Sequence, residues 1–177
     1  MNLIPLFSYG ILGLLIASIL LLVLFLMRLL QPSNKTIQKF SKLVSKHAIV
    51  IAFITVSLGT VGSLYLSEVA SFTPCKLCWY QRIFMYPQVV ILGIGYFLND
   101  IRVKIYALTL SIIGFMIAVY HILVQFLPTM FQCSDEAANC ALTQFVYFGF
   151  ITIPVMSAIT FGFIIIVLLF TFLRNSR

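Results

Sequence analysis

The segment that decides the fold is Pro74-Cys75-Lys76-Leu77-Cys78-Trp79-Tyr80-Gln81-Arg82, which joins two long apolar runs of the chain. Its two cysteines have the Cys-x-x-Cys spacing that is typical of redox thiols with a lowered pKa. If a helix begins here, its free N–H groups and the positive end of its dipole favour a thiolate. Arg82 would then lie one turn below Cys78 on the same face. The segment therefore predicts a redox-active cysteine pair at the mouth of a membrane helix.

The composition of the chain indicates that lipid surrounds it. Of the 177 residues, 62% are hydrophobic and only 8% are charged, which is more apolar surface than a soluble domain of this length can bury. Eleven basic and four acidic residues give a net charge of +7. Because the basic residues fall between the apolar runs, they indicate membrane topology, and no nucleic-acid partner is expected.

The apolar runs predict five membrane spans. Residues 1–30 are expected to form a retained N-terminal transmembrane helix, because their positive charge comes last, opposite to the order in a secretory signal. A cleaved signal peptide is the alternative. Residues 31–47 are interpreted as a basic cytoplasmic loop near anionic lipid, with a short amphipathic surface helix as the alternative. The remaining spans are expected at 48–67, 83–99, 105–127 and 145–173.

The distribution of charge predicts the orientation. All basic residues except Lys76 and Arg82 fall on one face of the five-span topology, which the positive-inside rule makes cytoplasmic. The N-terminus is then outside and the C-terminus is cytoplasmic. Both cysteine pairs would lie outside the cell membrane, on the side where disulfides persist.

Three interpretations compete for the four cysteines. Two structural disulfides are the general default for cysteines outside the cytoplasm. A tetrathiolate zinc site would suit the Cys-x₂-Cys pair, but Cys133-x₆-Cys140 is a loose partner and neither loop contains a histidine. A relay of two redox disulfides is favoured, because the first pair lies at a helix mouth beside Arg82 and a structural staple needs no such activation. No metal is predicted.

The segment from Cys75 to Arg82, continued by Met85-Tyr86-Pro87, closely resembles the signature of the DsbB/BdbC family of disulfide bond formation proteins. The run Gly149-Phe150-Ile151-Thr152-Ile153-Pro154 resembles the BdbC branch. The resemblance covers residues 48–173 and implies an all-α membrane protein in which they form a four-helix transmembrane bundle. Residues 1–30, as an additional N-terminal transmembrane helix, depart from the family's usual four spans, and the short Cys133–Cys140 spacing differs from that of proteobacterial members.

This resemblance implies a protein-dithiol:quinone oxidoreductase. Such a protein would reoxidise a DsbA/BdbD-like thioredoxin-fold partner outside the membrane and pass the electrons to a quinone, either menaquinone or ubiquinone. By analogy, the catalytic cysteines form the disulfides Cys75–Cys78 and Cys133–Cys140, and the thiolate of the partner attacks Cys133. Cys78 would face the quinone.

Two further residues are implied in quinone binding. Arg82 would stabilise the charge that develops on the quinone, although an arginine at a helix end often only reaches toward headgroups. His121 lies in the third core span, where related proteins have a histidine that looks like part of the quinone pocket. Its alternative role is a hydrogen bond to a neighbouring helix.

Two rival functions remain open at this point. A vitamin K epoxide reductase-like oxidoreductase also pairs four cysteines around a quinone, but there the loop pair precedes the Cys-x-x-Cys, and here the order is reversed. A non-enzymatic membrane protein with two structural disulfides is the rival from another class. Mixed disulfides with a partner and quinone-dependent redox cycling would distinguish a relay from an inert staple.

Overall fold

The computed structural model describes residues 4–31, 33–127, 143 and 145–173. Helices dominate this part of the chain, and the predicted all-α membrane fold is confirmed. The only strand-like feature within it is an isolated bridge between Tyr147 and Ile151. In chain order the elements are α1 (Ile4–Leu30), α2 (Lys35–Leu64), the π-helical turn η1 (Tyr65–Val69), α3 (Lys76–Phe97), α4 (Val103–Phe126) and α5 (Ile153–Leu173).

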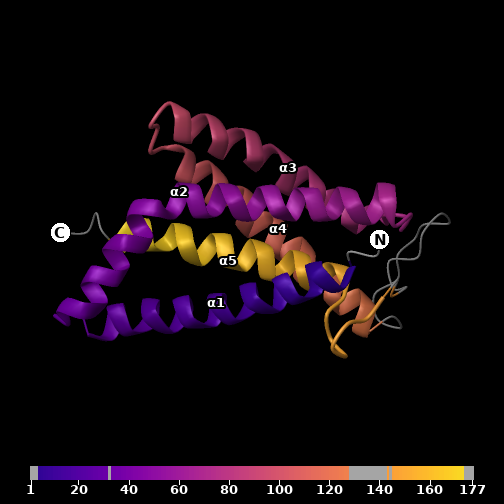
Figure 1. The fold of residues 1–177 in the computed structure, drawn as a ribbon, viewed down its shortest axis with the longest axis horizontal. Helices are drawn as coiled ribbons and strands as arrows, with labels where there is room; N and C mark the ends of the chain where they lie inside the picture. The colour runs from indigo at the N-terminus through magenta and orange to yellow at the C-terminus, as the bar shows by residue number, and fades with distance from the viewer. Residues whose placement is uncertain (1–3, 32, 128–142, 144, 174–177) are drawn as a thin grey trace.

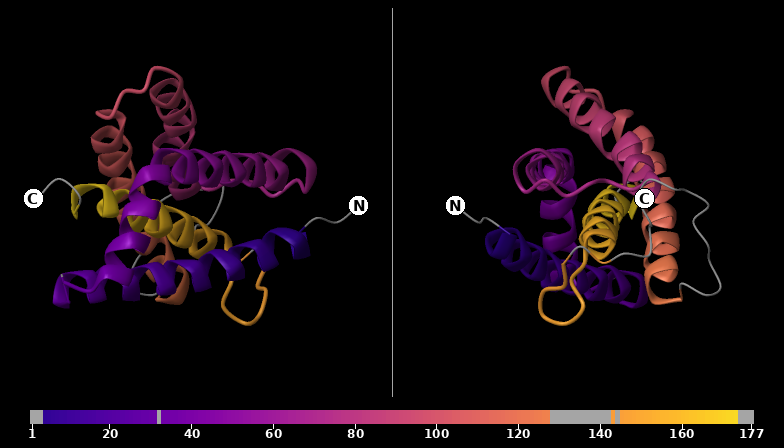
Figure 2. Two further views of the ribbon diagram at one scale, coloured as in Figure 1. Left: turned by 60° about the vertical axis from the view of Figure 1, so that its left-hand side comes forward. Right: turned by 90° about the vertical axis from the view of Figure 1, so that its right-hand side faces the viewer.

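Four of the helices form a bundle, and α1 packs on its outside. Helix α3 packs against α2 and α4, and α5 closes the ring by packing against the same two helices. Helix α1 lies along α5 and α2, so that α5 runs between α1 and α2 (Figures 1 and 2). The predicted arrangement of a four-helix bundle plus one N-terminal helix is therefore the observed one.

Helix α5 has the central position in the assembly, because it packs against α1, α2 and α4. Large side chains that are almost fully buried recur along it, namely Phe161, Ile164, Val167, Leu168 and Phe170. In lipid, apolarity alone does not bury a helix, so the position of α5 depends on how its side chains pack against its neighbours. Close approach is helped by Gly114 of α4, which lies directly against the ring of Phe161 and has no room for a Cβ. The core of the bundle therefore forms around α5.

The preferred interpretation of residues 31–47 as a loop is wrong, because α2 already begins at Lys35. The Asn34 side chain caps the helix by accepting hydrogen bonds from the backbone N–H groups of Thr36 and Ile37, which replaces partners that a helix N-terminus lacks. The alternative, an amphipathic helix, is closer to the structure. A buried row of small or apolar side chains recurs at helical spacing, at Ile37, Ser41, Ser45, Ala48 and Ala52, while the lysines between them are exposed.

The last predicted span, 145–173, begins eight residues too early. Residues 147–151 form a tight turn closed by the Tyr147–Ile151 bridge. Phe148 and Gly149 have φ angles of 51° and 77°, in the left-handed region that a right-handed helix excludes. Helix α5 starts only at Ile153, with Pro154 in its first turn, where proline is tolerated.

The helix ends fall into two groups. Four helices are long and apolar enough to cross a membrane: α1, α2 with η1, α4 and α5; among the described residues α3 does not meet that measure. Figure 1 shows the α1–α2 connection, the α3–α4 turn and the end of α5 at one end of the molecule. The start of α1, the connection from η1 to α3 and the end of α4 lie at the other end. This alternation is the one that the five-span topology requires, and its orientation in the membrane remains a prediction.

Candidate functional site

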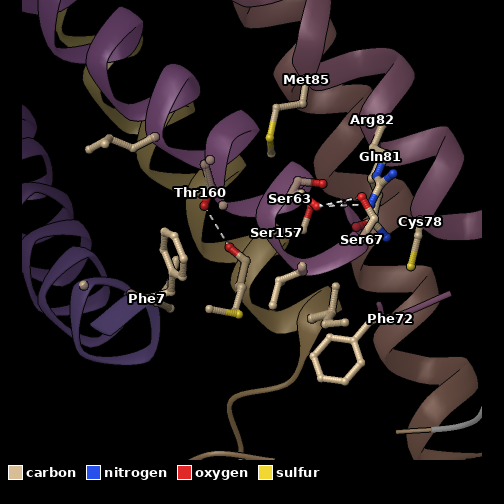
Figure 3. Close-up of a pocket in the computed structure, with 18 of the residues that line it drawn as sticks. Phe7, Ser63, Ser67, Phe72, Cys78, Gln81, Arg82, Met85, Ser157 and Thr160 are labelled. Carbon is tan, nitrogen blue, oxygen red and sulfur yellow. Dashed lines mark hydrogen bonds between the residues drawn. The ribbon is translucent and has the colours of Figure 1, made fainter. Parts of the chain in front are cut away.

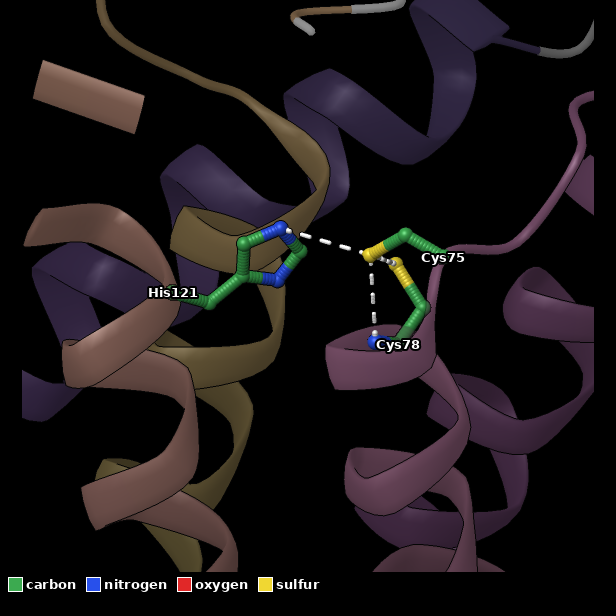
Figure 4. A group of neighbouring side chains, drawn as sticks. All are labelled: Cys75, Cys78 and His121. Atoms are coloured by element: carbon green, nitrogen blue, oxygen red, sulfur yellow. Dashed lines mark hydrogen bonds between the residues drawn. The ribbon is translucent and has the colours of Figure 1, made fainter. Parts of the chain in front are cut away.

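Cys75 and Cys78 meet at the N-terminus of α3, where the sequence predicted that a helix could begin. Cys75 is the N-cap residue, and its Sγ accepts a hydrogen bond from the backbone N–H of Cys78 at 3.4 Å. Its thiol in turn donates to Cys78 Sγ across 3.3 Å (Figure 4). Because a disulfide bond is about 2.05 Å long, the two sulfurs are not bonded to each other, and the pair is in its dithiol form. The Cys75–Cys78 disulfide stays a prediction for the oxidised form.

His121 reaches the cysteine pair from the facing helix α4. Its Nε2 lies 3.6 Å from Cys75 Sγ, and its Nδ1 lies 3.1 Å from Nε2 of Gln81. His121 is 2% exposed and Gln81 is 4% exposed, so neither side chain can turn to water for its hydrogen bonds. With the Gln81 amide donating to Nδ1, the ring proton is assigned to Nε2 and points at Cys75 Sγ. A buried polar chain therefore runs from Gln81 through His121 to both sulfurs.

The surroundings of Cys75, which precedes α3, raise the pKa of its thiol to about 11. The largest cause is the hydrogen bond to the Cys78 side chain, followed by burial, whereas the hydrogen bonds from His121 and from the Cys78 backbone lower the pKa. The expectation of a lowered pKa is therefore wrong for Cys75 in the reduced pair. Cys75 stays protonated and directs its S–H toward Cys78, where it stabilises negative charge on that sulfur.

The same three side chains have ligand atoms that could hold a metal ion. The sulfurs of Cys75 and Cys78 and a ring nitrogen of His121 all lie within 4.8 Å of one another. Two thiolates and an imidazole suit zinc or another thiophilic ion. Because a disulfide would use both sulfurs, metal binding and disulfide formation at this site exclude each other.

Arg82 lies one turn after Cys78 on α3, as the sequence predicted. Its Nη2 donates a hydrogen bond to the backbone carbonyl of Ser63 on α2 at 3.2 Å, and its guanidinium carbon lies 5.3 Å from the centre of the Trp79 ring. Tyr86 also reaches Ser63, through its hydroxyl at 3.3 Å. These contacts hold the half-buried Arg82 at the α2–α3 boundary.

A cavity of about 440 Å³ opens beside this boundary, between α1, α2, α3 and α5. Cys78, Gln81, Arg82, Ser63 and Ser67 give its wall a polar patch (Figure 3). The rest of the lining is largely apolar and includes Leu58, Met85, Met156 and Ile153. A pocket of this size, apolar with a few convergent polar groups, is typical of small-molecule sites.

The structure separates the two residues that the sequence assigned together to quinone binding. Arg82 lines the cavity beside Cys78, whereas His121 is not among the lining residues and lies against Cys75 instead. The structure also adds Gln81, which lies within the motif but for which the sequence alone indicates no role. A buried amide in a membrane helix needs a hydrogen-bond partner, and that requirement is the signal that could have singled it out.

The second cysteine pair, Cys133 and Cys140 with their predicted disulfide, lies outside the described residues. The part of the chain that leads to it is described up to Leu127. Val124, in the last turn of α4, packs in one cluster with Cys75 and Leu77. The chain therefore leaves α4 for Cys133 from a point next to the first cysteine pair.

Comparison with known proteins gives one family and several close relatives. A sequence model of the family described as "Disulfide bond formation protein DsbB" matches residues 45–171. A probable disulfide formation protein of Chlamydia muridarum is 42% identical over 129 residues, which cover 73% of this chain and 95% of that protein. Disulfide bond formation protein C of Bacillus subtilis is 44% identical over 117 residues, covering 65% of this chain and 85% of that protein. No solved structure matches the chain.

Proposed function

Since the chain belongs to the DsbB family of disulfide bond formation proteins, we propose that it oxidises the dithiol of a DsbA/BdbD-like thioredoxin-fold partner and passes the electrons to a membrane quinone. The partner would be oxidised outside the cell membrane and would in turn introduce disulfides into exported proteins. In each turnover, one dithiol of the partner becomes a disulfide, and two electrons and two protons reduce one quinone to the quinol.

The electrons would move through the two cysteine pairs in sequence. The partner's thiolate attacks the Cys133–Cys140 disulfide at Cys133, and a mixed disulfide with the partner forms and resolves. The dithiol of this pair is then reoxidised by the Cys75–Cys78 disulfide through thiol exchange, which needs one sulfur of each pair to come into contact. The packing of Val124 on Cys75 supports this order, because it brings the path to Cys133 beside the first pair.

Within the first pair, the geometry supports Cys78 as the sulfur that faces the acceptor. Cys78 lines the cavity, whereas Cys75 is buried beside His121. In the reduced pair, the Cys75 thiol donates its hydrogen bond to Cys78, so the sulfur that receives this bond is the one on the cavity wall. When the disulfide is opened by exchange, the Nε2–H of His121 is placed to stabilise negative charge on Cys75.

The cavity fits a quinone by its chemistry. The quinone supplies an oxidising ring that is soluble in lipid. Arg82 presents a fixed positive charge at the polar patch, held there by Ser63 and Trp79, where an anionic oxygen would be stabilised. Gln81 and Ser67 add polar atoms to the same patch, and the remainder of the cavity wall is largely apolar.

The required reduction potential also favours a quinone. Thiol oxidases of the partner class have reduction potentials of about −120 mV, whereas the potential of a glutathione-buffered oxidising compartment is about −180 to −210 mV. Reoxidation by glutathione disulfide would therefore be uphill by roughly 60–90 mV, or about 3–4 kcal/mol for two electrons. A quinone resides in the membrane and, as an acceptor of higher potential, would make reoxidation of the partner favourable.

The observation that carries the proposal is that Cys78 and Arg82 share the wall of one apolar cavity. The test is to mix the purified protein with a reduced thioredoxin-fold partner, with and without quinone, and to follow partner oxidation. We expect multiple turnovers only with quinone, and one quinol for each partner dithiol oxidised. Partner oxidation that is independent of quinone, or no oxidation at all, would contradict the proposal.

A further inference from the structure

Helix α1 forms one wall of the cavity, opposite the polar patch. Five of its residues line the cavity, and they lie at helical spacing: Leu6, Phe7, Gly10, Ile11 and Leu14. Positions three or four apart share one face of a helix, so this row is a single stripe of α1. Figure 3 shows Phe7 on α1 at one side of the cavity and Cys78 and Arg82 on α3 at the other.

Aromatic contacts fix this wall to the bundle. The ring of Phe7 lies 5.4 Å from that of Tyr65 in η1, and Phe25 lies 5.4 Å from Phe170 in α5. Both pairs have the centroid separations of favourable aromatic packing. Helix α1 is therefore anchored at both ends, and the position of its lining stripe is set by the bundle.

The two sides of the cavity differ in chemistry. The α3 and α2 side carries the thiol, guanidinium and hydroxyl groups of the polar patch, whereas the side chains that α1 contributes are hydrocarbon or, at Gly10, absent. From Leu6 to Leu14 the stripe runs for about 12 Å along the helix axis. A ligand that matches both sides has a polar ring at one end and a hydrocarbon chain at the other.

We propose that α1 binds the isoprenoid tail of the quinone, while the ring lies at the polar patch near Cys78. This inference rests on the quinone function proposed above and extends it to a helix that precedes the family match at residues 45–171. It gives the N-terminal helix a role in the selection of quinones by their tails.

Gly10 provides the sharpest test, because a Cβ built there meets nothing within 4 Å although the residue lines the cavity. A leucine at this position adds bulk to the cavity wall at the space assigned to the tail, and its Cβ displaces no neighbour. Gly13 is the matched control, since a Cβ there also meets nothing within 4 Å and the residue is not part of the lining. Both substitutions replace a glycine by leucine on the same exposed helix.

Quinone reduction by the two variants is measured with a quinone that carries an isoprenoid tail and with the same ring without a tail. We expect Gly10→Leu to raise the apparent KM for the tailed quinone by about tenfold, the scale of a steric mismatch in an apolar pocket, and to leave the tailless quinone within about twofold of wild type. Gly13→Leu should behave as wild type with both. Equal behaviour of Gly10→Leu and Gly13→Leu, or an equal loss with both quinones, would overturn the inference.

A second measurement uses the wild-type protein and requires no turnover, so it does not depend on how well a variant folds. A quinone with a photoreactive group at the end of its tail is illuminated with the wild-type protein, and the labelled peptides are identified by mass spectrometry. The tail should label residues 6–14 in competition with unlabelled tailed quinone. Labelling confined to α3, α4 and α5 would overturn the role of α1 and leave the quinone function standing, whereas wild-type protein that reduces neither quinone would end the proposed function itself.

Discussion

The imidazole Nε2 of His121 lies 3.6 Å from Sγ of Cys75, although 46 positions separate the two residues in the chain. The contact joins the last part of α4 to the N-terminus of α3, because His121 lies five residues before the end of α4 and Cys75 caps α3. It gives the buried cysteine a hydrogen-bond donor that the Cys-x-x-Cys motif alone does not contain. We therefore propose that His121 positions Cys75 and stabilises negative charge on its sulfur.

Substitution of His121 by alanine is expected to slow thiol exchange at the first pair. A hydrogen bond to a charged group contributes about 1.5–3 kcal/mol, so exchange in which Cys75 leaves as a thiolate should be roughly ten- to hundredfold slower. The rate is measured by stopped-flow reduction of the oxidised pair with a small dithiol. Because Gln81 acts through His121, adding Gln81→Leu to His121→Ala should cause little further loss.

Gln88 offers a matched control for this prediction. Like Gln81, it is a buried amide of α3. It accepts a hydrogen bond from Ser111 of α4 and donates one to the carbonyl of Phe84, so it does not act on the cysteine pair. Gln88→Leu should lower thermal stability and leave the exchange rate unchanged. If His121→Ala exchanges as fast as Gln88→Leu, the contact with Cys75 is only structural.

The cysteines should divide the reaction into two separable halves. Cys75→Ser and Cys78→Ser are expected to abolish quinone reduction, because no disulfide can form at the cavity. Cys133→Ser should block electron entry from the partner, yet a small dithiol should still reduce the Cys75–Cys78 bond and support quinone reduction. Quinol formation is followed by absorbance with each electron donor. Unchanged turnover in Cys78→Ser would be incompatible with the relay.

Arg82→Ala is expected to impair quinone binding more than it lowers the stability of the fold. The variant loses the charge at the polar patch and the hydrogen bond to Ser63, and we expect the apparent KM for quinone to rise by roughly tenfold, the scale of one charge-assisted hydrogen bond. Arg82→Lys keeps the charge without the planar fork and should be intermediate. If Arg82 only reaches toward headgroups, thermal stability will fall in Arg82→Ala while the KM stays at the wild-type value.

The orientation in the membrane can be tested with two exposed serines at opposite ends of the molecule. Ser33 lies in the α1–α2 connection and Ser71 in the connection that leads to Cys75. In a background whose native cysteines are replaced by serine, a membrane-impermeant maleimide should label Ser71→Cys in intact cells. Ser33→Cys should be labelled only after permeabilisation. The reverse pattern would place the first cysteine pair in the cytoplasm and contradict the predicted topology.

The sequence predicts most of the fold because apolar run length determines where lipid-embedded helices lie. It misplaces the start of α2, where charge suggested a loop. The buried Ser41 and Ser45 face the bundle at helical spacing while exposed lysines cover the other side. It misplaces the start of α5 because the turn at Phe148 and Gly149 is as apolar as the helix that follows, so hydropathy does not distinguish them.

For the site, the sequence predicts contacts between residues that are close together in the chain, but not contacts between different helices. Cys75 caps α3, and Cys78 and Arg82 follow on its first two turns, so their proximity follows from the helix repeat. The contacts of His121 with Cys75 and Gln81 depend instead on the relative register of α3 and α4. The position of α1 over the cavity depends on its packing against α5 and η1, which hydropathy alone does not specify.

The most direct test of the central claim is a single turnover of the first pair alone. Cys133→Ser/Cys140→Ser protein is fully reduced, freed of reductant and mixed with quinone in the absence of oxygen; thiols are then trapped with acid and counted. The account predicts loss of both thiols, a Cys75–Cys78 disulfide and one quinol for each protein molecule. Thiols that stay reduced in the presence of quinone, or that oxidise equally without it, would contradict it.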